Sequence, residues 1–222
     1  MKVAVVGAGS WGTAVAGIVA PKADTVLWAR RDEVAAAVNA DHANPDYLPD
    51  VPLPETLEAS TDLDAVVEGA DVIVMGVPSH GYRTVLASAA PRIPATTPIV
   101  SLSKGIEAET LMRMTEVVAD VLPSHDRSII GVLTGPNLAK EVAAGQPAAS
   151  VVGMEHAETA ASLQELFMTP TFRVYTNGDI VGCEAAGALK NVMAIAAGMA
   201  HGLGFGDNTL AALITRALAE LT

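Results

Sequence analysis

The sequence predicts a doubly wound α/β fold, in which a mostly parallel sheet is followed by the start of an all-helical C-terminal domain. Short runs rich in valine and isoleucine alternate with alanine-rich segments of helical length. This pattern is typical of parallel strands that helices cover on both faces. The first run leads directly into a glycine-rich turn and a helix. After residue 178 no further strand-like run follows, and the chain reads as two helices.

Seven apolar runs are the expected strands. They are KVAVVG (2–7), TVLWAR (25–30), DVIVMGV (71–77), PIVSLS (98–103), SIIGVLT (128–134), AASVVG (148–153) and TFRVYT (171–176). Residues 42–56, HANPDYLPDVPLPET, hold four prolines and can form neither a helix nor a central strand. We interpret this segment as a surface excursion.

The change of character near residue 177 divides the chain into two expected domains. Residues 1–178 would form the sheet domain, and residues 179–222 the first helices of a helical substrate or catalytic domain. The last helix runs to the final residue without a Gly, Asn or Pro stop. Since an all-helical region that has only begun usually continues, we expect the sequence to stop inside this second domain.

The composition restricts the partners. The chain of 222 residues carries a formal net charge of −12, which repels nucleic acid and anionic membranes, so neither is expected as a partner. A single cysteine, Cys183, excludes an internal disulfide and fits a reducing compartment. The longest uncharged helical run, residues 191–206, is shorter than a bilayer span and is interrupted by glycine. We therefore expect a cytoplasmic protein without an integral membrane segment.

Residues 3–12, VAVVGAGSWG, place Gly7, Gly9 and Gly12 in a G-x-G-x-x-G pattern between a strand and a helix. The first glycine permits the tight turn, the second lets the backbone approach a pyrophosphate, and the third lets the helix pack on the strand. A glycine-rich turn without a ligand is less favoured, because strand, helix and second strand follow in the required order. Ser10 and Trp11 could contact the cofactor, although Trp11 could equally serve packing.

The end of the second strand bears on the choice of cofactor. An NAD site usually presents a carboxylate about 20 residues after the glycines, to hold the ribose hydroxyls. Here Arg30 and Arg31 stand at that place, and arginine pairs with the 2′-phosphate that a carboxylate would repel. NADP, as NADPH, is therefore favoured over NAD. The alternatives are that both arginines form a solvated helix flank, and that Asp32 selects NAD.

Two lysines stand out in this acidic chain. Lys104, with Arg30 and Arg31, lies just past the carboxyl end of a predicted strand, where open α/β sheets bind ligands. Its alternative is an exposed loop lysine. Lys190 lies in a helix almost free of charge, where burial and a second cation such as Lys104 would lower its pKa and suit it to acid–base catalysis. A snorkelling lysine on a half-exposed helix is an equally good interpretation.

Two further strand ends, PSH (78–80) and GPN (135–137), point to the same edge of the sheet. Their exposed amides could bind an anion. His80 could act as an acid or base, although a histidine at a helix start is the commoner case. Asn137 is first a helix N-cap and only second a ligand contact.

Six sequence blocks together resemble the bacterial NAD(P)-dependent glycerol-3-phosphate dehydrogenase family. They are VVGAGSWGTA, VPSH, SKGIE, TGPNLAKEVAAGQP, FRVYTN and GALKNVMAIAAGMAHGLGFGDNTLAALITRALAE, in colinear order over nearly the whole chain. The resemblance implies a Rossmann domain followed by a helical domain. It also implies an oxidoreductase that reduces dihydroxyacetone phosphate to sn-glycerol 3-phosphate for phospholipid synthesis, with no metal.

The resemblance also implies roles for individual residues. In addition to the three glycines, the resemblance implies that these residues contact the cofactor: Ser10, Trp11, Arg30, Arg31, Lys104 and Ala139. Lys104 is expected near both nicotinamide and substrate, and Lys190 is the expected proton-transferring lysine. Gly135 and Asn137 are expected substrate contacts. The family often has Thr or Ser where this chain has Asn137, so a backbone contact is expected there and a side-chain contact is not.

The family carries a Ser-Arg-Asn segment for the substrate phosphate, preceded by a substrate-contacting aspartate, and both would lie beyond residue 222. We expect dinucleotide binding but little or no turnover from a protein that ended there. Two other functions stay open: a dehydrogenase of a hydroxy acid with the same layout, and a non-catalytic dinucleotide sensor. A small-molecule phosphate substrate is the expected partner, and a homodimer is compatible with the sequence.

Overall fold

A computed structural model describes residues 1–221 of the chain. In this range, eight strands form one sheet: β1 (Lys2–Val6), β2 (Asp24–Trp28), β3 (Leu57–Ser60), β4 (Val72–Met75), β5 (Ile99–Ser101), β6 (Ile130–Thr134), β7 (Ala148–Gly153) and β8 (Phe172–Asn177). The helices are α1 (Ser10–Val19), α2 (Asp32–Asp41), α3 (Leu63–Val67), α4 (Ser79–Ala89), α5 (Met114–Val121), α6 (Ala139–Ala143), α7 (Ala157–Phe167), α8 (Ile180–Gly202) and α9 (Asp207–Leu221), with short 3₁₀ turns η1 (Ala90–Arg92) and η2 (Arg127–Ile129).

The strands follow the order β3-β2-β1-β4-β5-β6-β7-β8. Neighbouring strands run parallel except β6 and β7, which are antiparallel. The order reverses between β1 and β4, and a doubly wound sheet has its ligand crevice at such a switch point, outside the carboxyl ends of the strands. The predicted fold class, a mostly parallel Rossmann-type sheet, is confirmed.

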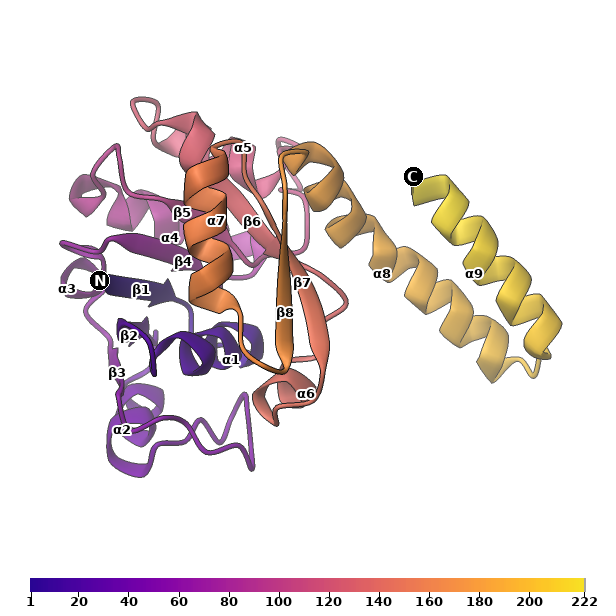
Figure 1. Ribbon diagram of the computed structural model, residues 1–222, viewed down its shortest axis with the longest axis horizontal. Coiled ribbons are helices and arrows are strands. Elements are labelled where there is room, and N and C mark those ends of the chain that lie inside the picture. Colours follow the sequence, from indigo (N-terminus) through magenta and orange to yellow (C-terminus); the bar gives the residue numbers. More distant parts are fainter. Residues whose placement is uncertain (222) are drawn as a thin grey trace.

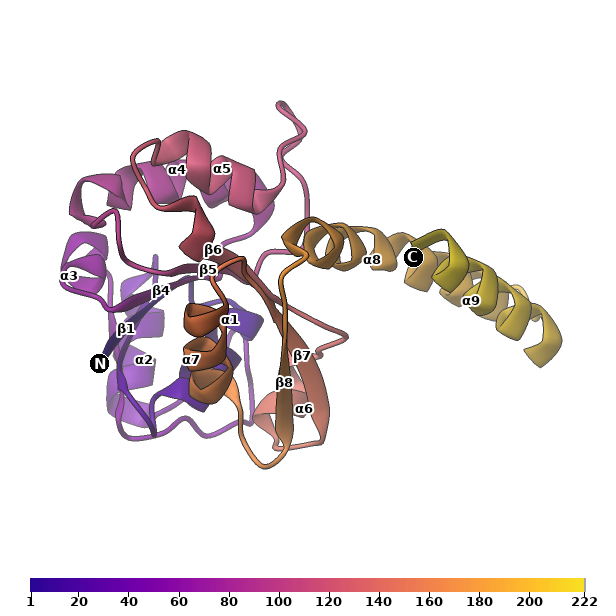
Figure 2. The same ribbon diagram turned by 45° about the horizontal axis from the view of Figure 1, so that its top comes forward.

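Two apolar cores lie on opposite faces of the sheet. One core packs α1 and α7 against the sheet, and the other packs α3, α4 and α5 against it, as Figure 2 shows. Successive residues of β1 alternate between them, because side chains in a strand point to opposite faces: Val5 belongs to the first core and Val6 to the second. Strands buried on both faces explain the near-continuous valine and isoleucine runs in the sequence.

Strand β3 was not predicted. It pairs with β2 at the edge of the sheet, and only its Leu57 and Ala59 side chains are buried. Because LEAS holds no β-branched or aromatic residue and follows the prolines directly, it has no strand signal of its own.

The interpretation of residues 42–56 as a surface excursion is wrong in part. Asn44 is fully buried, and its Nδ2 donates hydrogen bonds to the Ala8 carbonyl (3.0 Å) and to Thr13 Oγ1 (2.8 Å). Leu48 and Leu53 join the core. The prolines prevent regular structure, but these contacts fix the segment against the glycine loop and α1.

After β8 the chain leaves the sheet as a hairpin of α8 and α9, which projects away from the sheet domain (Figure 1). The predicted helical region is confirmed. At 23 residues, α8 is longer than the uncharged run measured in the sequence, and by length and composition alone it could cross a membrane. Its first turns pack on β6 and β7.

Candidate functional site

The loop between β1 and α1 has the shape of a pyrophosphate cradle. Gly7 has a φ of +121°, and a Cβ there would lie 2.8 Å from the Gly76 carbonyl carbon. A Cβ on Gly12 would lie 2.0 Å from the Gly7 oxygen, whereas a Cβ on Gly9 would meet nothing within 4 Å. No side chain caps the first turn of α1, so its amides can bind an anion.

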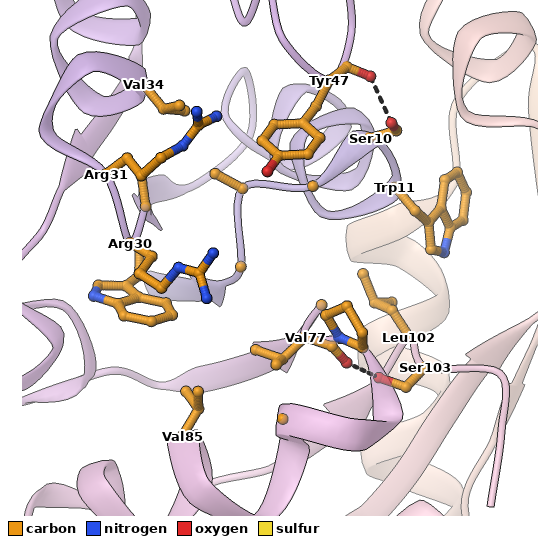
Figure 3. Close-up of a pocket in the computed structure, with 18 of the residues that line it drawn as sticks. Ser10, Trp11, Arg30, Arg31, Val34, Tyr47, Val77, Val85, Leu102 and Ser103 are labelled. Carbon is orange, nitrogen blue, oxygen red and sulfur yellow. Dashed lines mark hydrogen bonds between the residues drawn. The ribbon is translucent and has the colours of Figure 1, made fainter.

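A cavity of about 470 Å³ opens beside this cradle, a volume within the range of ligand pockets. Its lining includes the predicted residues Gly7, Gly9, Ser10, Trp11, Arg30 and Arg31, together with His80 in the first turn of α4. Figure 3 shows Tyr47 and Arg31 on one side of the cavity and Val77 and Leu102 on the other. The sequence predicts Val77 and Leu102 within strands. In the structure β4 and β5 end earlier, and both residues line the cavity.

Trp11 packs against the core and also lines the cavity, so its predicted contact with a cofactor stays a prediction. Its ring packs edge-on against Phe172 with 6.1 Å between the ring centroids. Its Nε1 is buried and has no hydrogen-bond partner within residues 1–221. Buried donors normally have a hydrogen-bond partner, so this nitrogen is an exception within the described residues.

The two arginines differ in their surroundings. Arg31 forms an ion pair with Asp46, and its guanidinium lies 5.4 Å from the centroid of the Tyr47 ring. Arg30 points into the cavity (Figure 3) and takes part in none of the ion pairs of the described residues. The Tyr47 carbonyl accepts a hydrogen bond from Ser10 Oγ (2.5 Å). Nothing in the sequence predicts Asp46 and Tyr47 at this site, because the proline-rich segment holds no motif that would place them here.

Lys104 lies directly after Ser103, which lines the cavity, at the carboxyl end of β5. Its Nζ donates a hydrogen bond to the Gly135 carbonyl oxygen (3.0 Å). Partial burial lowers the pKa of Lys104, and the positive charge of Lys190 lowers it further. Lys190 is half-buried on α8, with its Nζ 3.1 Å from Asn191 Oδ1. The structure thus brings Lys104, Gly135 and Lys190 together from three elements.

Asn137 and Ala139, which follow Gly135 in the sequence, are the other two predicted site residues of this segment. The Asn137 side chain donates to the Ala149 carbonyl (2.8 Å) and accepts from Ser150 Oγ (3.1 Å), so it is committed to β7. The prediction that Asn137 is a helix N-cap is wrong, because Leu138 occupies that position of α6. Ala139, the first residue of α6, packs against the core and does not line the cavity.

The loop that carries Lys104 is anchored by an ion pair. The guanidinium of Arg83 on α4 binds both carboxylate oxygens of Glu107, at 2.8 and 2.9 Å. This pairing, with a hydrogen bond from Thr110, lowers the pKa of Glu107 to about 2. Within residues 1–221, no three His, Cys, Asp or Glu side chains gather in an arrangement that could hold a metal ion.

Two family models match the chain. The model described as "NAD-dependent glycerol-3-phosphate dehydrogenase N-terminus" matches residues 2–160, and its C-terminal counterpart matches residues 179–222. A curated glycerol-3-phosphate dehydrogenase [NAD(P)+] 2 of Sphingopyxis alaskensis is 53% identical over 222 residues, and one of Thermobifida fusca is 52% identical over 221. The chain spans 66% of the length of each of these relatives, and the alignments cover 100% and 99% of the chain.

Solved structures give the same result. A glycerol-3-phosphate dehydrogenase from Coxiella burnetii superimposes with a TM-score of 0.90 at 39% identity, over 99% of this chain and 67% of that one. A glycerol-3-phosphate dehydrogenase from Saccharomyces cerevisiae superimposes with a TM-score of 0.88 at 29% identity, over 100% of this chain and 69% of that one.

Proposed function

Because this chain belongs to the NAD-dependent glycerol-3-phosphate dehydrogenase family, we propose that the protein interconverts dihydroxyacetone phosphate and sn-glycerol 3-phosphate with NAD(P)H. The observation that carries the proposal is that Lys190 of α8 lies close enough to Lys104 for its positive charge to lower the pKa of Lys104, which directly follows the cavity-lining Ser103. Two cations at the ligand-binding edge of an acidic chain suit a phosphorylated substrate and an oxygen that becomes negative.

The residues fit a dinucleotide. Gly7, Gly9, Ser10, Trp11 and Gly12 would hold the pyrophosphate, since the cradle excludes side chains and offers free helix amides. Arg30, assisted by Arg31, would hold the 2′-phosphate of NADPH, which makes NADP the preferred cofactor and NAD the alternative. Ala139 would lie against the cofactor. When bound, the nicotinamide supplies the hydride.

The ketone carbon of the substrate gains a hydride and its oxygen gains a proton. We assign the proton to Lys190 Nζ, as general acid. Lys104 stabilises the negative charge that develops on the oxygen, because the Gly135 carbonyl holds it in place and its partial burial strengthens electrostatic interactions. Gly135 and Asn137 would contact the substrate through their backbones.

The decisive experiment follows the oxidation of NADPH by dihydroxyacetone phosphate in the complete protein. Lys190→Ala should lower kcat by about 10²–10⁴-fold and leave NADPH affinity unchanged, because only proton transfer is removed. Lys140→Ala, which changes an exposed lysine of α6, is the control. Full activity in Lys190→Ala would refute the assignment.

Two alternatives can be separated when the reverse reaction, the reduction of NADP+, is also followed with glycerol 3-phosphate and with 3-hydroxy acids. A hydroxy acid dehydrogenase would oxidise 3-hydroxy acids and ignore glycerol 3-phosphate. A non-catalytic dinucleotide sensor would bind NADPH and never oxidise it. We further propose a role in phospholipid synthesis, a cytoplasmic location, a homodimer, and a domain boundary between residues 178 and 179.

A further inference from the structure

Glu184, on the second turn of α8, is a buried carboxylate that the proposed chemistry does not use. Its side chain is 7% exposed. One carboxylate oxygen forms an ion pair with Arg113 at 2.6 Å and accepts from Thr115 Oγ1, and the other accepts from the Thr115 amide at 3.0 Å. These contacts join α8 to the start of α5, about 70 residues earlier in the chain.

The root of α8 fits the sheet closely on both sides of Glu184. A Cβ on Gly153 of β7 would lie 3.0 Å from Cys183 Cβ, and a Cβ on Gly187 would lie 2.7 Å from Thr134 Oγ1 of β6. Small residues therefore set the distance between α8 and the sheet. Close packing alone lets a helix tilt or roll, whereas an ion pair with two further hydrogen bonds fixes its orientation.

We propose that Glu184 is a positioning residue for Lys190: it clamps the root of α8 to α5 and thereby holds the Lys190 ammonium beside Lys104. Lys190 lies six residues further along, roughly 9 Å along the helix axis. A tilt of about 10° at the clamp would move it by roughly 1.5 Å, and misplacements of about 1 Å can cost 10²-fold in rate. The inference rests on the proposed function for its kinetic test, but not for its structural one.

The kinetic test is a double-mutant cycle in the complete protein. Glu184→Ala should lower kcat by about 10–100-fold without changing NADPH affinity, and Glu184→Gln, which keeps the size of the side chain, should give a smaller loss. In a Lys190→Ala background both changes should have little further effect, since they act through Lys190. The matched control is Glu116→Gln. It removes the other carboxylate that pairs with Arg113, which belongs to α5 itself.

The structural test uses Cys183, the only cysteine of this sequence, which is 9% exposed. Alkylation of its thiol by iodoacetamide, followed by peptide mass mapping, should be slow in the wild type and in Glu116→Gln and faster in both Glu184 variants. Unchanged protection of Cys183, or a kcat loss that persists in full in the Lys190→Ala background, would overturn the clamp. Absence of turnover in the wild type would refute the proposed function instead, and the thiol test would still decide the clamp.

Discussion

Cofactor choice should depend on Arg30 far more than on Arg31. Arg30 lines the cavity and forms no ion pair within residues 1–221, whereas Arg31 already pairs with Asp46. A charge-assisted hydrogen bond contributes about 1.5–3 kcal/mol. Arg30→Ala should therefore weaken NADPH binding by about 10–150-fold, at 1.4 kcal/mol for each factor of ten.

Arg31 would interact with a bound 2′-phosphate while it also pairs with Asp46. Its side chain is 43% exposed and that of Asp46 is 51% exposed, and such solvated pairs contribute only about 0.2–1 kcal/mol. Arg31→Ala should therefore cost NADPH affinity less than Arg30→Ala does. Asp46→Asn releases Arg31 and should tighten NADPH binding by up to about 5-fold.

The assay is a fluorescence titration of each variant with NADPH and with NADH, which lacks the 2′-phosphate and serves as the internal control. NADH affinity should stay unchanged in all three variants. If Arg30→Ala weakens NADH and NADPH alike, Arg30 does not bind the 2′-phosphate. If Arg31→Ala costs more than Arg30→Ala, the ion pair with Asp46 does not restrain Arg31 as the structure indicates.

Two further predictions concern stability. Gly12→Ala should lower the free energy of unfolding by about 1–3 kcal/mol or more, because the new Cβ would overlap the Gly7 carbonyl. Gly9→Ala has open space around its Cβ, so it should leave thermal unfolding unchanged and weaken only NADPH binding. An equal loss of stability in both variants would contradict the cradle geometry. The pKa of Glu107 is lowered to about 2, so its ion pair with Arg83 stabilises the fold fully above about pH 4.5 and is lost as the pH falls toward 2. Urea unfolding between pH 5 and 2.5 should show a shallower acid loss in Glu107→Gln than in the wild type, and identical slopes would contradict this assignment.

The fold could be predicted because its signals are local. Each apolar run and each glycine of the turn reports on its own few residues, and the alternation of strands and helices then selects the topology. Strand β3 lacked such a signal, since LEAS is stabilised by pairing with β2 and by the burial of Leu57 and Ala59. Its pairing partner lies about 30 residues away, and only the folded sheet brings the two together.

The site could be predicted only where it follows from strand ends. The glycine loop, Arg30 and Lys104 lie at carboxyl ends of strands, and parallel strands bring those ends to one edge. Tyr47 and Asp46 come from a segment without regular structure, whose path depends on the buried hydrogen bonds of Asn44. Polar contacts of this kind leave no periodic pattern in a sequence.

Lys190 shows most clearly what the sequence could not decide. Its helix pattern fits a buried lysine and a snorkelling lysine equally well, because the pattern does not say where the helix docks. In the structure Lys190 is half-buried, and its positive charge helps to lower the pKa of Lys104. The docking that joins them depends on Glu184 and its partners at the start of α5. Each lysine lies on an element that the sequence predicts, but their proximity arises only from tertiary contacts between α8, α5 and the sheet, and the proposed chemistry requires that proximity.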